Sequence, residues 1–287
     1  MHLLRVCCTL VFGIIVLATA GGSVRAQAVA VDLHLVLAVD VSWSMDPEEQ
    51  RLQRDGYVEA FRDPQVIKAI QSGPNRRIAV TYFEWAGADI HFLVVPWVII
   101  DGPAAARRLA DQLSERNISR HRMTSISSAL QFARGLLAEA PWPTPRRVID
   151  VSGDGPNNSG PSPVTMIRDE LVAEGIIING LPIMLKVGDA SSYGFGQDIA
   201  DLDVYYARCV IGGPGSFMIP IRKREEFSTA TRQKLLLEIS GLEIPRIHRA
   251  QFVPPPAPGT APGASEPYDC EVGERNWRRY YLDRGRF

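Results

Sequence analysis

A short polar motif follows an apolar run near the start of the chain. Asp40, Ser42 and Ser44 come directly after a mostly apolar run that is typical of a strand buried on both faces. Carboxylate and hydroxyl oxygens are the hard ligands that Mg²⁺ prefers, and Mg²⁺ needs few protein ligands because it retains several waters. Thr124 precedes a predicted helix and Asp154 follows a later predicted strand, so both can supply oxygens at the same sheet edge. The pattern predicts a divalent-cation site formed by these five residues.

The same polar residues also have a simpler interpretation as helix caps and turns. Ser and Asp cap helix N-termini, so an Asp-x-Ser-x-Ser string alone does not establish a metal site. Its position favours the metal, because ligands bind beyond the carboxyl ends of parallel strands. Residues 153–158, Gly-Asp-Gly-Pro-Asn-Asn, are similar to a dinucleotide-binding glycine motif, but Asn158 replaces the third glycine. We interpret this segment as the loop that presents Asp154, with Asn157 and Asn158 either supporting the site or forming the turn.

Three further residues are expected at the rim of the site. Trp43, between the two serines, offers either an aromatic contact to a partner or packing beneath the loop. Glu84, at the end of the second predicted strand, is either a supporting carboxylate or a solvated strand end. His121 is either a general base or a surface loop residue. Because the chain has no Gly-x-Ser-x-Gly elbow, a serine hydrolase is poorly supported.

Alternating apolar and helical patterns surround these residues. Predicted strands cover residues 33–39, 77–83, 91–100, 148–152 and 176–181, with a short strand at 216–219. Predicted helices cover residues 47–61, 104–113, 126–137, 164–174, 198–210 and 225–239. Strands that alternate with helices indicate an α/β fold with a doubly wound, mostly parallel sheet flanked by helices. Pro96 assigns its strand to an edge, and the first strand is expected near the centre.

The two ends of the chain differ in composition from this predicted domain. Residues 1–26 combine a basic start, an apolar stretch and a small-residue cleavage pattern, which predicts a secretory signal peptide removed after Ala26 rather than an anchor. Residues 31–241 form the predicted domain, 242–267 a linker rich in Pro, Gly and Ala, and 268–287 a tail. No later apolar run is long enough to span a membrane, so we expect a periplasmic or secreted protein.

Composition excludes several classes of protein. The 287 residues include 31 basic and 32 acidic ones, and removal of the two arginines in the signal peptide leaves 29 against 32. A nucleic-acid partner is therefore not expected, because neutralising phosphates needs an excess of Lys and Arg. Four cysteines without a Cys-x-x-Cys pair exclude a disulfide scaffold and a zinc ribbon. Cys7 and Cys8 leave with the signal peptide, and Cys209 and Cys270 are expected to form a disulfide, with two free thiols as the alternative.

The polar motif, with its placement, resembles that of a known family. Asp40, Ser42 and Ser44 after a strand, Thr124 ahead of a helix and Asp154 after a later strand look like the metal-ion-dependent adhesion site (MIDAS) of von Willebrand factor A-type (VWA) domains. The resemblance implies that the two serines and the threonine bind the metal directly. It also implies that the aspartates act mostly through water and that a partner's carboxylate completes the coordination.

Longer stretches are similar to one bacterial branch of such proteins. Residues 80–85, 147–158 and 210–217 look like the exported DUF1194 family, whose function is unknown. The resemblance covers about residues 31–239. The chain departs from the A-type pattern at residues 121–123, His-Arg-Met, where small glycines are common ahead of the threonine.

Together these features predict an exported protein-binding module. One Mg²⁺ or Mn²⁺ is expected to coordinate an acidic residue of an unidentified protein partner. One alternative is a metal-assisted hydrolase of the same fold, with the ion as Lewis acid and His121 as its only nearby base. Another is a structural interaction domain without a bound metal, because a fold by itself does not define a function.

Overall fold

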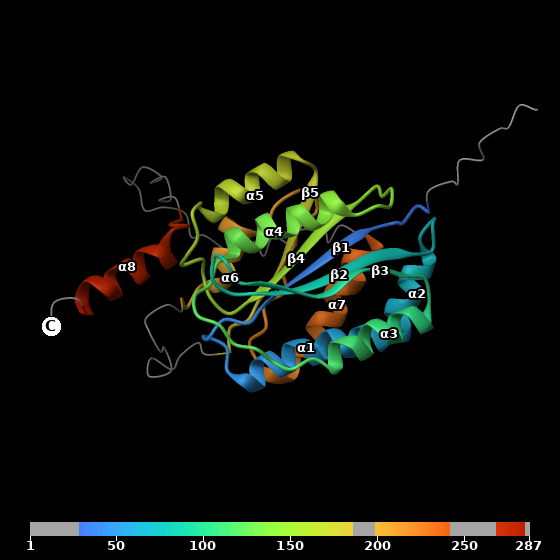
Figure 1. Ribbon diagram of the computed structural model, residues 1–287, viewed down its shortest axis with the longest axis horizontal. Coiled ribbons are helices and arrows are strands. Elements are labelled where there is room, and N and C mark those ends of the chain that lie inside the picture. The colour runs from blue at the N-terminus through green and yellow to red at the C-terminus, as the bar shows by residue number, and fades with distance from the viewer. Residues whose placement is uncertain (1–28, 186–198, 242–267, 285–287) are drawn as a thin grey trace, which may run out of the picture.

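Five strands form a central sheet in the computed structural model, which describes residues 29–185, 199–241 and 268–284 (Figure 1). The strands are β1 (His34–Asp40), β2 (Ile78–Trp85), β3 (His91–Ile100), β4 (Arg147–Gly153) and β5 (Ile176–Pro182), in the order β3-β2-β1-β4-β5. All neighbouring pairs are parallel except β2 and β3, which form an antiparallel pair at one edge. The predictions of a mostly parallel sheet, a central first strand and an edge strand containing Pro96 are confirmed.

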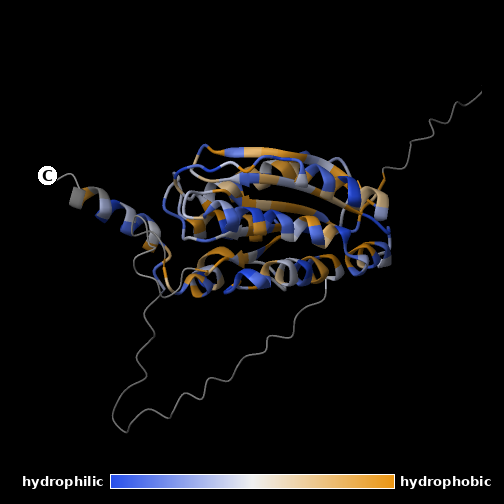
Figure 2. Cartoon of the chain, turned by 90° about the horizontal axis from the view of Figure 1, so that it is seen from below, coloured by the Kyte–Doolittle hydropathy of each residue, from blue (hydrophilic) through white to orange (hydrophobic). Residues whose placement is uncertain are grey.

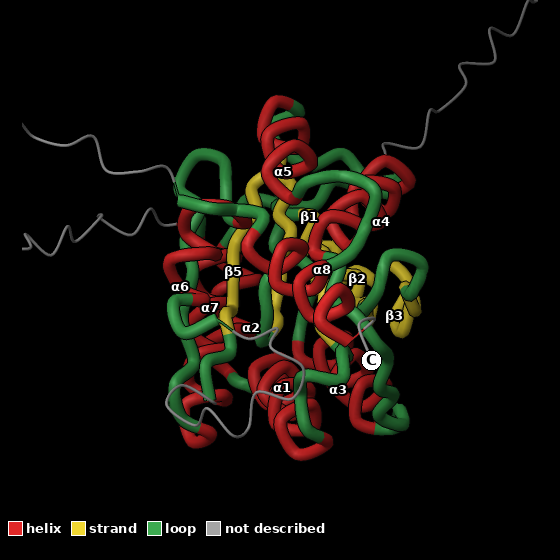
Figure 3. Tube along the Cα trace, turned by 90° about the vertical axis from the view of Figure 1, so that its left-hand side faces the viewer, coloured by secondary structure: helices red, strands yellow, loops and turns green. Residues whose placement is uncertain are grey.

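Helices cover both faces of this sheet. The helices of the described residues are α1 (Pro47–Arg62), α2 (Pro64–Ser72), α3 (Pro103–Ser114), α4 (Ile126–Glu139), α5 (Val164–Ala173), α6 (Leu202–Tyr205), α7 (Phe227–Ser240) and α8 (Val272–Arg284), with a π-helical turn η1 (Tyr206–Val210) and a 3₁₀ turn η2 (Arg224–Glu226). In Figure 1, α4 and α5 lie on one side of the sheet and α1, α2, α3 and α7 on the other. Helix α8 extends from the domain, and in Figure 3 it stands in front of the strand ends.

Local capping features mark the start of α1 and the end of α7. The Asp46 carboxylate accepts hydrogen bonds of 2.8 Å from the backbone N–H groups of Glu48 and Glu49, and the Glu49 carboxylate accepts one from Asp46 N–H. This capping box, followed by Pro47, starts α1 immediately after the polar motif. Helix α7 ends at Gly241, whose φ of 63° lies in the left-handed region that glycine adopts without strain.

Most of the hydrophobic core lies in two large clusters, one on each face of the sheet. Every residue of β1 is buried, as expected for a central parallel strand. One apolar cluster lies under α1, α2, α3 and α7, and the other under α4, α5, α6 and η1. Figure 2 shows the strands mainly in hydrophobic colours, whereas α8 is mainly hydrophilic. The sheet is thus a rigid support for the loops at its carboxyl edge.

The short strand predicted at 216–219 is wrong. Met218 forms only an isolated bridge with Gly180, and Ile221 forms another with Ile183. Pro220 lies between the two bridges and has no N–H group to donate, which prevents a continuous ladder.

Helices α2 and α8 were not predicted. Helix α2 is short, with 9 residues, and helix α8 is rich in arginine and aromatic side chains rather than apolar positions of helical period. The predicted signal peptide (1–26) and the linker (242–267) lie outside the described residues. None of the helices in the described part of the chain combines the length and apolar character that a bilayer crossing requires.

Candidate metal centre

The polar motif after β1 meets the loop after β4. Ser42 Oγ lies 2.7 Å from Ser44 Oγ, and Ser44 Oγ donates a hydrogen bond of 2.5 Å to Asp154 Oδ1. These contacts form because β1 and β4 are adjacent and parallel, so their carboxyl ends lie side by side. Two hydroxyls and one carboxylate from two loops are therefore in direct contact.

Asp40 ends β1 and is completely buried. Its Oδ1 accepts a hydrogen bond of 2.6 Å from Ser42 N–H, whereas its Oδ2 accepts none at normal geometry from the described residues. Burial raises the pKa of Asp40 well above its ordinary value, and the negative charge of Asp154 adds to the rise. A nearby cation would favour the ionised form of this carboxyl, and no basic side chain of the described residues offsets the rise.

Thr124 is held against the same two loops by its backbone. Its N–H group donates a hydrogen bond of 2.8 Å to Asn158 Oδ1, and Asn158 N–H donates one of 2.9 Å to the Thr124 carbonyl. His121 N–H donates to the carbonyl of Val41 at 3.0 Å, so the segment leading to Thr124 also runs beside the polar motif. The structure therefore places the segment at Thr124 next to the polar motif after β1 and the loop after β4.

The bulky residues ahead of Thr124 are accommodated by local backbone geometry. Met123 has a φ of 71°, in the left-handed region that non-glycine residues rarely adopt. Opposite it, a Cβ added to Gly87 would lie 3.0 Å from the carbonyl oxygen of Arg122. Because Gly87 has no side chain, it leaves room for residues 121–123, where the A-type pattern commonly has glycines.

Asn157 connects the Asp154 loop to three other elements. Its Oδ1 accepts a hydrogen bond of 3.0 Å from Ser127 N–H in the first turn of α4. Its own N–H donates to Tyr205 Oη at 3.1 Å, and its Nδ2 donates to Glu274 Oε1 of α8 at 2.7 Å. Asn157 therefore fixes the position of the loop rather than simply forming a turn.

Glu84 lies away from solvent in β2. It is buried and forms an ion pair with the buried guanidinium of Arg54 in α1. Arg54 also donates to the carbonyl oxygens of Arg116 and Asn117, which places it under the segment leading to His121. In this position Glu84 acts through Arg54 on the loop backbone.

Trp43 and His121 lie at the rim with two arginines. Trp43 is 49% exposed, and the guanidinium carbon of Arg122 lies 5.2 Å from the centroid of its ring. Arg120 donates a hydrogen bond of 2.8 Å to the Trp43 carbonyl. The His121 ring is 4.9 Å from that of Phe92, which is itself exposed on β3.

Four residues that lie near the site, or support it, were not predicted from the sequence. Gly153 allows close approach, since an added Cβ would lie 2.8 Å from Asp40 Oδ2 and 3.1 Å from Tyr206 Oη. The Tyr206 hydroxyl is buried, and burial together with the charge of Asp40 raises its pKa well above the ordinary value. Its neighbour in sequence, Tyr205, and the distant Glu274 hold the loop through Asn157. No local pattern marks either partner, whereas Gly153 beside Asp154 is a usable signal for close approach.

The donor atoms available here fit a hard divalent cation. Among the described residues no three His, Cys, Asp or Glu side chains gather in a metal-binding arrangement, so the candidate centre relies on hydroxyls and two carboxylates. Such oxygen ligands suit Mg²⁺ or Mn²⁺ rather than a softer metal. The buried Asp40 oxygen without a hydrogen-bond donor is the observation that favours a cation here.

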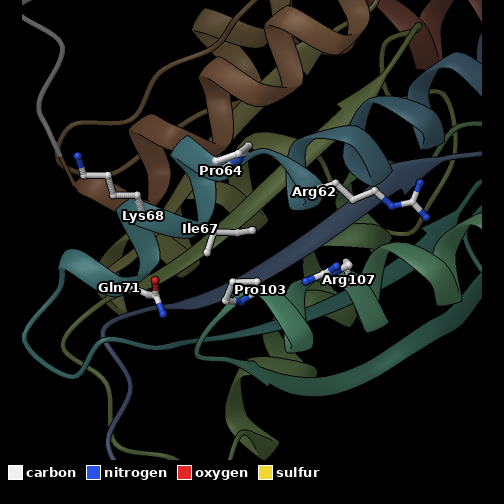
Figure 4. A pocket seen from close by; sticks show the side chains of 7 residues that line it. All are labelled: Arg62, Pro64, Ile67, Lys68, Gln71, Pro103 and Arg107. Atoms are coloured by element: carbon white, nitrogen blue, oxygen red, sulfur yellow. The ribbon is translucent and has the colours of Figure 1, made fainter.

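A separate pocket of about 420 Å³ lies at the opposite end of the sheet (Figure 4). It is lined by Arg62, Pro64, Ile67, Lys68, Gln71, Pro103 and Arg107. Arg62 is the last residue of α1, a 16-residue helix of about 24 Å that begins beside the candidate centre. The side chains of Arg62 and Lys68 point in opposite directions in Figure 4, so these cations do not converge on one anion site.

Residues 30–243 match the model of a family described as "Protein of unknown function (DUF1194)". The chain belongs to the DUF1194 family. The match covers all of the central sheet and the helices up to α7. A comparison with curated proteins found no match.

Solved structures with a similar fold include proximal thread matrix protein 1 from the mussel byssus, with a zinc-occupied MIDAS motif. It aligns with a TM-score of 0.51 and 13% identity over 74% of this chain and 47% of that one. The pilus adhesin SpaC from Lactobacillus rhamnosus GG aligns with a TM-score of 0.53 and 12% identity over 74% and 30%. A von Willebrand factor type A protein from Catenulispora acidiphila aligns with a TM-score of 0.48 and 14% identity over 73% and 43%. This chain thus spans less than half of each relative.

The predicted VWA-type fold is confirmed by the sheet order and by the first two of these similarities. The predicted disulfide is also present, since Cys209 Sγ and Cys270 Sγ are bonded. It joins the turn η1 to the segment that leads into α8.

Proposed function

We propose that this chain is a protein-binding module that captures a carboxylate of a partner protein through one divalent cation, Mg²⁺ or Mn²⁺. The ligands are Asp40, Ser42, Ser44, Thr124 and Asp154. The observation that carries the proposal is the set of contacts from Ser42 Oγ through Ser44 Oγ to Asp154 Oδ1, beside a buried Asp40 carboxylate with one oxygen lacking a donor.

The ligands divide the task between charge and neutral oxygens. Asp40 and Asp154 supply negative charge, and the three hydroxyls supply neutral donors. When bound, the cation supplies a positive charge with a coordination position that is open to an anionic ligand. The hydrogen bond from Ser42 N–H to Asp40 Oδ1 orients the carboxylate, and Asn158 sets the position of Thr124 through its backbone.

The rim favours an acidic protein as the partner. Trp43 is exposed beside Arg120 and Arg122, and Trp and Arg are the residues enriched in the energetic centres of protein interfaces. Two cations next to a metal attract an acidic segment and orient it during encounter. The zinc-occupied MIDAS of the mussel protein and the description of SpaC as an adhesin agree with this proposal.

The proposal places the module outside the cytoplasm. The signal-peptide pattern of residues 1–26 supports export, with cleavage after Ala26. The Cys209–Cys270 disulfide also supports it, because disulfides persist in oxidising compartments.

Calorimetric titration of the purified protein with Mn²⁺ and Mg²⁺ tests the metal site. Asp154→Ala and Ser42→Ala are expected to weaken binding at least about 10-fold, since removing even a supporting group costs that much. Ser72→Ala, which removes an exposed hydroxyl at the end of α2, is the matched control and should bind as the wild type does. Equal affinity for all four proteins would refute the assigned ligands.

Capture of a partner tests the rest of the proposal. Cross-linking in cell-envelope extract with Mg²⁺ should retain a protein that is lost with EDTA, with Asp154→Ala, and after its acidic side chains are blocked as amides. Retention of the same protein under all of these conditions would exclude carboxylate capture by a metal.

A further inference from the structure

The first turn of α8 packs directly on the loop that carries Asp154. Glu274 Oε1 accepts the hydrogen bond of 2.7 Å from Asn157 Nδ2. One residue earlier, Gly273 leaves no room for a Cβ against the carbonyl oxygen of Asn157. The helix therefore touches both the backbone and the side chain of a residue located three positions after Asp154.

Asn157 passes this contact on to the rest of the site. Its Oδ1 also accepts a hydrogen bond from Ser127 N–H, and its own N–H donates one to Tyr205 Oη, so its position depends on α4, α6 and α8 together. Its neighbour Asn158 holds Thr124 by two hydrogen bonds, and Asp154 in the same loop accepts from Ser44. A displacement of Asn157 would therefore move both Asp154, in the loop after β4, and Thr124, in the loop before α4.

A covalent bond and one hydrogen bond keep α8 in this place. Cys270, two residues before the helix, is bonded to Cys209, which is completely buried in η1. Tyr268 Oη donates a hydrogen bond of 2.9 Å to Asp201 Oδ2 just ahead of α6. Beyond its first turn α8 extends away from the domain (Figure 1), whereas the hydrogen bond to Asn157 and the disulfide lie at its start.

We propose that the disulfide-anchored first turn of α8 is a positioning element for the metal-binding loop, with Glu274 and Asn157 as the positioning residues. The segment lies outside residues 30–243, which match the family model. The inference rests on the proposed metal site for its effect on affinity, whereas its effect on loop order is independent of any metal. Loss of the anchor lowers divalent-cation affinity at least about 5-fold, the lower end of typical coupling between sites.

Four variants of the full chain separate positioning from general stability. Cys270→Ser removes the anchor while Cys209 stays buried in the core. Glu274→Ala removes the acceptor of the Asn157 hydrogen bond and is expected to lower affinity about 2- to 10-fold, the range of one net hydrogen bond. Glu274→Gln keeps Oε1 and replaces only Oε2, which makes no hydrogen bond among the described residues, so it restores wild-type affinity. Glu271→Ala removes an exposed carboxylate just before the helix and is the matched control.

Two readouts are measured on each variant, Mn²⁺ affinity by titration and amide hydrogen exchange without metal. The amides of Asn157 and Asn158 report the loop, because they donate to Tyr205 Oη and to the Thr124 carbonyl. The amide of Val41, bonded to the Trp85 carbonyl, reports the adjacent sheet end. Cys270→Ser and Glu274→Ala are expected to speed exchange at the loop amides but not at Val41, and to weaken Mn²⁺ binding.

The outcomes distinguish this inference from the proposed function. If the wild type fails to bind Mn²⁺, the proposed metal site is wrong, and the exchange rates still decide whether α8 positions the loop. If the wild type binds Mn²⁺ and Cys270→Ser matches it in affinity and loop exchange, α8 does not position the loop. Equal losses in Glu274→Gln and Glu274→Ala would also overturn the assignment of the hydrogen bond.

Discussion

Asp40→Asn is expected to make the metal-free protein more stable while removing its stabilisation by metal. The carboxylate is fully buried, one of its oxygens lacks a donor, and its pKa is raised by burial and by Asp154. Asparagine keeps the oxygen that accepts from Ser42 N–H and removes the charge. Because a raised native-state pKa means that ionisation costs stability as the pH rises, the advantage of asparagine should be larger at pH 8 than at pH 5.

The magnitude follows from the unpaired oxygen and from ligand linkage. A buried polar group without a full set of partners costs about 1–3 kcal/mol, and more when it is charged, so removing the Asp40 charge should recover an energy of about this size. In a domain of this size each kcal/mol shifts the melting temperature by about 2–4 °C. The metal-free Asp40→Asn protein should therefore melt roughly 2–12 °C above the metal-free wild type. A metal at about 100 times its dissociation constant adds about 2.7 kcal/mol to the wild type, or roughly 5–11 °C. The variant should gain much less.

Differential scanning calorimetry at pH 8, in EDTA and in saturating Mg²⁺ or Mn²⁺, measures both effects. Asp63→Asn is the matched control, because it makes the same change at the cap of α2 and asparagine caps equally well. A variant that melts below the wild type in EDTA would show that Asp40 is satisfied without a cation. A metal shift as large as that of the wild type would show that Asp40 does not contribute to binding.

Further substitutions test the buried ion pairs of the core and the end of α7. Lys234 Nζ is buried 2.5 Å from both Asp150 and Glu238, so Lys234→Met leaves two buried carboxylates without a cation. The substitution should lower the free energy of unfolding, measured by urea denaturation, by about 3–5 kcal/mol. An unchanged free energy would refute the ion triad. Burial and the charge of Asp150 raise the pKa of Glu238 to about 7. The stability of the wild type should therefore fall as the pH rises from about 4.5 to 7, and Glu238→Gln should flatten that fall in calorimetry. Parallel curves of stability against pH for the two proteins would contradict this. Gly241→Ala should cost about 1–2 kcal/mol because of its left-handed φ, while Gly135→Ala inside α4, with open space at its Cβ, should not destabilise.

The architecture could be predicted because its signals are local. The apolar run of β1 can be interpreted without knowing its neighbours, because an apolar run of this kind is typical of a strand covered on both faces. Pro96 identifies an edge strand because it cannot donate to a ladder, and Asp46 with Pro47 marks the start of α1. The positions of Asp40 and Asp154 after two such strands follow from the same local patterns.

The partners of these residues could not be predicted because they are distant in sequence. Glu84 is expected at a rim from its place at a strand end, yet its burial depends on Arg54, which lies on a helix with a mostly polar sequence. Glu274 is 117 residues from Asn157, and nothing near either residue indicates the contact. Residues 216–219 include β-forming types, which led to the predicted strand. Pro220 prevents a continuous ladder and leaves only single bridges, and whether such a segment pairs as a strand depends on the neighbouring strand β5.

A row of polar side chains along β4 shows why such partners matter for the site. Asp150 and Ser152 in β4 are two residues apart, the spacing that places strand side chains on one face, and Asp154 follows just after the strand ends. The first is paired with Lys234, and the second accepts a hydrogen bond of 2.5 Å from Gln53. Each buried polar group would destabilise the core alone, and each is satisfied by a side chain from α7 or α1. The helices that satisfy them thereby fix the strand whose end presents Asp154, so the geometry of the candidate centre depends on polar contacts inside the core as well as on the loops around it.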